Sequence, residues 1–62
     1  MNQAAIYAKT AAFRDYVRAR KLEVYNRDLR RKEIAERHRQ KAERLEAEFP
    51  DFAEAYKRER GQ

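Results

Sequence analysis

The stretch FRDYVRARKLEVYNRDLRRKEIA, residues 13–35, joins two apolar patterns and decides the fold of this 62-residue chain. The first pattern consists of residues that recur at helical spacings on one face: Ile6, Phe13, Val17 and Val24, with Tyr16 at the edge. Spacings of seven, four and seven residues place side chains in one stripe at 100° per residue. The first pattern therefore predicts a helix over residues 3–25.

A second helical pattern follows in a new register. Its members are Ile34, His38, Ala42, Leu45 and Phe49, with Ala35 beside them. It predicts a second helix over residues 28–48. Between the two patterns lie Asn26 and Asp28, either of which can cap a helix N-terminus. We therefore expect a turn at residues 26–28. The alternative is one unbroken helix whose apolar face changes sides in the middle.

Pro50 ends the second helix, because proline lacks an N–H donor and disfavours a helical residue before it. Asp51 and Glu54 suit the first turn of a third helix over residues 51–60, and Gly61 suits its end. The sequence thus predicts an all-α fold in one domain over residues 1–62. It is a helical hairpin with two arms of about 21 residues each, followed by a short C-terminal helix.

The composition limits what such a fold can do. Lys and Arg number 16 against 11 Asp and Glu, the net charge is +5, and there is no cysteine. Only 10 of the 62 residues are Ile, Leu, Val or Phe. A chain this short buries only about 60% of its unfolded surface, and a disulfide cannot support it. We therefore expect self-association, or docking on a larger protein complex, to complete the core.

Catalytic, cofactor and metal sites are not expected. His38 is the only histidine, and the chain has no serine or cysteine, so the common nucleophile–base pairs cannot form. Three and four residues after His38 stand Lys41 and Ala42, which cannot share a metal ion with it. There is no Gly-rich loop to hold a phosphate. The sequence predicts a protein that is not an enzyme and has no small-molecule substrate.

The positive charge lies in the N-terminal half. Residues 1–32 hold nine Lys and Arg against three acids, and residues 33–62 hold seven against eight. Arginine makes up 11 of the 16 cations, and its guanidinium forms bidentate contacts with phosphate or carboxylate. The predicted basic binding surface consists of Arg14, Arg18, Lys21, Arg27, Arg30, Arg31 and Lys32.

Aromatic residues are the second candidate binding feature. Four Tyr and three Phe are more than a two-helix seam can bury. Because Tyr is enriched in interface hot spots, we assign the surplus to an interface. The predicted interface aromatics are Tyr7, Tyr25, Phe49, Phe52 and Tyr56.

Two functions fit these features. The first is a small protein-interaction module: a subunit, adaptor or inhibitor of the size common among phage and plasmid regulators. The alternative is an RNA- or DNA-associated protein whose cations contact the phosphate backbone. No uncharged run is long enough for a membrane span or a signal peptide. We therefore expect a cytoplasmic protein without a membrane partner.

Overall fold

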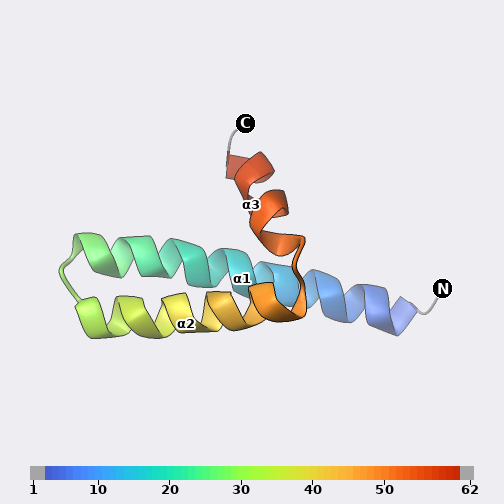
Figure 1. Cartoon of the computed structure of the whole chain (residues 1–62), viewed down its shortest axis with the longest axis horizontal. Coiled ribbons are helices and arrows are strands. Elements are labelled where there is room, and N and C mark those ends of the chain that lie inside the picture. The colour runs from blue at the N-terminus through green and yellow to red at the C-terminus, as the bar shows by residue number, and fades with distance from the viewer. Residues whose placement is uncertain (1–2, 61–62) are drawn as a thin grey trace.

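The computed structural model describes residues 3–60, and the side chains of residues 8–60. These residues form three helices and no strand: α1 (Gln3–Asp28), α2 (Lys32–Glu48) and α3 (Phe52–Arg60). Helices α1 and α2 lie side by side as an antiparallel hairpin, and α3 rises from the side of the hairpin away from the turn (Figure 1). The predicted all-α hairpin with a short third helix is confirmed.

The turn lies later than predicted, and the arms have 26 and 17 residues. Helix α1 continues through residues 26–28, and the chain leaves helical geometry only at Leu29–Arg31. Asn26 is buried, and its side-chain amide donates to the Leu22 carbonyl at 2.7 Å. The expectation that Asn26 or Asp28 caps α2 was wrong, and so was the alternative of one unbroken helix.

Backbone hydrogen bonds explain why α1 ends where it does. The Arg30 N–H donates to the Arg27 carbonyl at 3.0 Å, and the Arg31 N–H donates to the Asn26 carbonyl at 2.8 Å. Arg30 has a φ of 61°, in the left-handed region. This pattern is a Schellman motif, in which the left-handed position is usually glycine. Arg31 then stands at the N-cap of α2 and makes no side-chain capping hydrogen bond.

Small residues form much of the seam between the two arms. The buried residues of the arms are Tyr16, Ala19 and Asn26 on α1 and Ala35 and Ala42 on α2. Their spacings of three and seven residues are those of helices packed along a heptad seam. Alanine on both sides lets the two helix axes approach closely, because the interaxial distance depends on the side chains at the contact.

The expected apolar face of α1 is therefore rotated away from the seam. Val24 is 40% exposed, and Ile34 on α2 is 42% exposed. Phe13 and Val17 are partly buried, but against the cluster that includes α3. The side chain of Ile6 lies outside the described part of the chain. Bulky residues dominated the predicted face of α1, whereas its buried contact residues are Tyr16, at the edge of that face, with Ala19 and Asn26.

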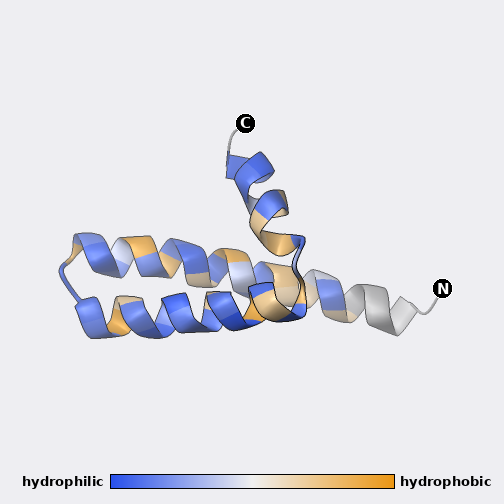
Figure 2. Cartoon of the chain, viewed as in Figure 1, coloured by the Kyte–Doolittle hydropathy of each residue, from blue (hydrophilic) through white to orange (hydrophobic). Residues whose placement is uncertain are grey.

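Helix α3 is held to the hairpin by an aromatic cluster. Phe52 is 2% exposed and lies 5.1 Å from the Phe13 ring and 4.6 Å from the Phe49 ring, centroid to centroid. Tyr56 stands edge-on to Tyr16 at 5.9 Å. Figure 2 shows apolar residues gathered where the start of α3 meets the two arms, on a chain that is otherwise mostly hydrophilic. This cluster is the largest concentration of buried apolar surface and fixes the position of α3.

Candidate functional site

The predicted basic residues separate into three groups in the structure. Arg14, Arg18 and Lys21 are exposed on the outer face of α1 and form what we call the cationic stripe. Beside it is a shallow hollow of about 380 Å³ that Phe13, Val17, Leu22 and Glu59 also line. The cationic stripe thus borders apolar side chains.

The second group lies at the hairpin tip, which we define as residues 29–34. Arg30, Arg31 and Lys32 are all exposed there. Leu29 and Ile34 are 46% and 42% exposed. The third group is Arg27 alone, which lines a different hollow, described below. The seven cations are therefore distributed over two hollows and the hairpin tip.

These cations share one property across all three groups. Among residues whose side chains are described, the ion pairs use Lys9, Arg20 and Arg39, and none of the seven predicted cations takes part. Arg27 does not pair with Glu23, four residues before it, because Glu23 pairs with Arg20. The seven side chains are therefore available for an external anion.

The aromatic residues mostly belong to the interior. Of the predicted interface aromatics, Phe52 is buried, and Phe49 and Tyr56 are partly buried against it, so these three pack within the chain. They pack together where α3 meets the hairpin. Tyr25 is 58% exposed and remains a candidate contact residue. The side chain of Tyr7 lies outside the described residues.

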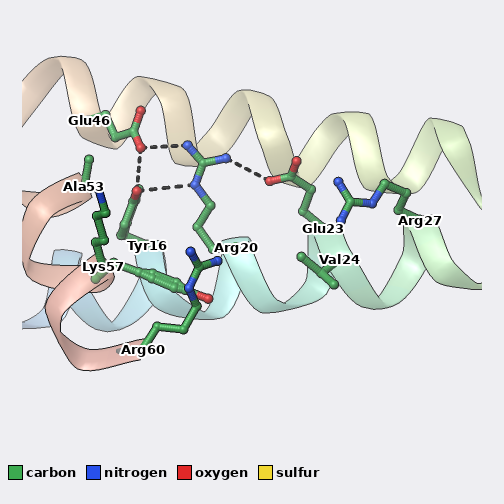
Figure 3. A pocket seen from close by; sticks show the side chains of 10 residues that line it. Tyr16, Arg20, Glu23, Val24, Arg27, Glu46, Ala53, Lys57 and Arg60 are labelled. Atoms are coloured by element: carbon green, nitrogen blue, oxygen red, sulfur yellow. Dashed lines mark hydrogen bonds and ion pairs between the residues drawn. The ribbon is translucent and has the colours of Figure 1, made fainter. Parts of the chain in front are cut away.

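A polar cleft lies between α1 and α3, and Glu46 of α2 also lines it. It has a volume of about 370 Å³. Its lining, drawn in Figure 3, consists of Tyr16, Arg20, Glu23, Val24, Arg27, Glu46, Ala53, Tyr56, Lys57 and Arg60. We call it the α1–α3 cleft.

A hydrogen-bonded network crosses the back of this cleft. Arg20 donates to Glu46 at 2.6 Å and to Glu23 at 2.9 Å. It also donates to the Tyr16 hydroxyl at 3.3 Å, and that hydroxyl in turn donates to Glu46. The network joins α1 to α2 and satisfies the polar groups that the hairpin partly buries (Figure 3).

The network shifts the pKa values of its members. Burial raises the pKa of Glu46, but the hydrogen bonds from Tyr16 and Arg20 outweigh burial and hold it below its usual value. Burial and the hydrogen bond to Glu46 raise the pKa of the Tyr16 phenol. Burial lowers the pKa of Arg20, but its hydrogen bonds to Tyr16, Glu46 and Glu23 raise it overall. Glu46 and Arg20 are therefore charged at neutral pH, and Tyr16 is protonated.

Sequence reasoning did not find this network. Tyr16 and Arg20 are four residues apart, so their contact on one face of a helix is readable from the sequence. Their partner Glu46 lies 26 residues from Arg20, and the match depends on how the two arms align. That alignment follows from the turn, which the sequence placed too early.

Within the described residues, no group of three or more His, Cys, Asp and Glu side chains could hold a metal ion. In the same part of the chain, no helix is both long enough and apolar enough to cross a membrane.

Comparisons with known proteins add no relative. No protein-family model, no curated protein and no solved structure matches this chain.

Proposed function

We propose that this chain is a non-enzymatic protein-interaction module that binds an acidic surface of a larger protein through the cationic stripe. One observation carries the proposal: unpaired Arg14, Arg18 and Lys21 share a hollow with the apolar side chains of Phe13, Val17 and Leu22. Interfaces between proteins combine an apolar centre with polar contacts at the rim. The hollow and its cations have this composition.

The exposed Tyr25 extends the proposed surface. At 100° per residue, Tyr25 continues the line of Arg14, Arg18 and Lys21 along α1. Tyr and Arg are the residue types most enriched in binding hot spots. Carboxylates of a partner can pair with the arginines while its apolar residues enter the hollow.

Nucleic acid is the second candidate, and the seven unpaired cations support it. Binding to a phosphate backbone depends steeply on salt, with log K falling by about 0.7 to 0.9 per contacted phosphate for each unit of log salt. An apolar hollow contributes little to such a contact, because phosphates and sugars are polar. We therefore rank protein first, and the following experiment separates the two candidates.

The test is affinity capture from the native host with three baits, each with and without nuclease. The baits are the unchanged chain, the stripe variant R14Q/R18Q/K21Q, and the control variant R37Q/K41Q/R44Q. The control removes the same charge from exposed positions of α2. We expect one set of proteins to survive nuclease treatment on the unchanged and control baits and to be lost from the stripe variant.

Two results would contradict the proposal. If nuclease removes all captured material, nucleic acid is the partner. If the control variant loses the captured proteins as completely as the stripe variant, net charge and not the stripe is responsible. Circular dichroism of all three baits verifies that each keeps its helices.

A further inference from the structure

The α1–α3 cleft holds positive charge that the described residues do not neutralise. Four cations line it, Arg20, Arg27, Lys57 and Arg60, against two carboxylates. Both carboxylates are engaged by Arg20. The other three cations form no ion pair with any residue whose side chain is described, which leaves the lining with an excess of positive charge.

The unpaired cations come from two helices and are spread along the cleft. Figure 3 shows Lys57 and Arg27 towards opposite ends, with Arg60 between them. The Arg60 guanidinium lies 5.8 Å from the centre of the Tyr56 ring. Stacking on an aromatic ring restrains the guanidinium and leaves its N–H groups free to bind an anion. Because like charges on facing helices repel, an anion between them would relieve that repulsion.

We propose that the α1–α3 cleft binds an oligophosphate, meaning a chain of two or more phosphate groups that is either free or attached to a nucleoside. The spread of the cations fits an elongated anion better than a single phosphate. An oligophosphate also carries several negative charges and is small enough for a cleft of about 370 Å³. Arginine forks bind phosphate oxygens in bidentate geometry.

The cleft and the cationic stripe have no residue in common, and the proposal does not depend on the proposed function. The two are neighbours, because Lys21 of the stripe and Arg60 of the cleft both line a smaller hollow of about 120 Å³. An oligophosphate in the cleft would bridge α1 and α3, in addition to the aromatic cluster that already joins them. A ligand that binds only the folded chain stabilises it, so the melting temperature should rise with ligand concentration.

The experiment uses the full chain labelled with nitrogen-15 and sodium tripolyphosphate as the probe, with sodium chloride at matched ionic strength. Amide and Arg Nε–H shifts locate the site. The variants are Arg60→Gln and Lys57→Gln. Arg58→Gln is the matched control, because Arg58 is exposed on the same helix but does not line the cleft.

We expect tripolyphosphate to shift the resonances of residues 20–27 and 53–60 and to raise the melting temperature. The dissociation constant should rise about tenfold in Arg60→Gln and in Lys57→Gln, as expected for losing one charged contact. It should change less than about twofold in Arg58→Gln. A parallel titration with ATP identifies the source: tighter binding of ATP indicates a nucleotide, and tighter binding of tripolyphosphate a free oligophosphate.

Three results would overturn the proposal. The first is the absence of shifts beyond those given by sodium chloride. The second is shifts confined to the cationic stripe or the hairpin tip, which would assign the phosphate to another surface. The third is equal weakening in Arg58→Gln and Arg60→Gln, which would show that net charge binds the probe. The capture experiment on the cationic stripe is decided by its own variants and does not depend on the outcome of this titration.

Discussion

Replacing Arg30 by glycine should stabilise this protein, because Arg30 occupies a left-handed backbone position with a φ of 61°. For a residue with a Cβ atom, that conformation costs about 1–2 kcal/mol, and glycine avoids the cost. Glycine also makes the unfolded chain more flexible, which offsets about 0.4–1 kcal/mol of the gain. The net expectation is a free energy of unfolding higher by about 0.5–1 kcal/mol. In a domain this small, that corresponds to a melting temperature higher by about 2–8 °C.

The assay is thermal unfolding followed by circular dichroism at 222 nm, with urea unfolding as a second measure. Arg30→Ala is the matched control, because it removes the same charge but keeps the Cβ atom. Alanine should therefore leave the melting temperature nearly unchanged. If alanine stabilises as much as glycine, relief of charge repulsion at the tip is the cause. If glycine lowers the melting temperature, the backbone argument is refuted.

Two further predictions concern the core and the polar network. Phe52→Ala removes a ring of the aromatic cluster that is only 2% exposed and should cost about 3–5 kcal/mol, enough to abolish cooperative melting of so small a domain. Tyr25→Ala, at a ring 58% exposed, should change stability by less than about 0.5 kcal/mol. Similar losses in both variants would contradict the assignment of Phe52 to the core. Because the pKa of Glu46 is lowered by folding, its contribution is present above the ordinary carboxyl pKa of about 4.3 and is lost as the pH falls through the folded value. Between pH 7 and pH 3, the urea midpoint should therefore fall less steeply with pH in Glu46→Gln than in the unchanged chain. The control Glu48→Gln, at an exposed residue, should keep the pH dependence of the unchanged chain. A Glu46→Gln profile parallel to that of the unchanged chain would refute the role of Glu46 in the network.

The sequence was sufficient to predict the helices but not how they face each other. Helical spacing of apolar residues and the single proline predicted three helices in the right order. On the first helix, the predicted apolar face consisted of Ile6, Phe13, Val17 and Val24, because large side chains dominate any hydropathy pattern. Ala19, which that pattern left out, is buried in the contact, whereas Ala42 was part of the predicted face of the second helix. A single sequence does not distinguish a seam alanine such as Ala19 from one that merely favours helix.

The turn and the cleft show a second limit. Polar capping residues predicted a turn at 26–28. The observed turn instead has Arg30 at the left-handed position, where glycine is usual, and Arg31 at the N-cap, where a short polar residue is usual. The exposed positions of Arg14, Arg18 and Lys21 agree with the sequence, because they follow from helical geometry alone. By contrast, the sequence did not predict that Arg27 lines the same cleft as Lys57 and Arg60. That placement depends on where the aromatic cluster holds α3.

The aromatic cluster also has a consequence for the order of folding. The two arms meet next to a turn of three residues, so their first contacts close only a short loop. The contacts of Phe13 and Tyr16 with Phe52 and Tyr56 close loops of about 40 residues, so forming them before the hairpin costs more conformational entropy. The hairpin should therefore form early and the docking of α3 late. Substitutions at Phe52 mild enough to preserve folding should then speed unfolding far more than they slow folding.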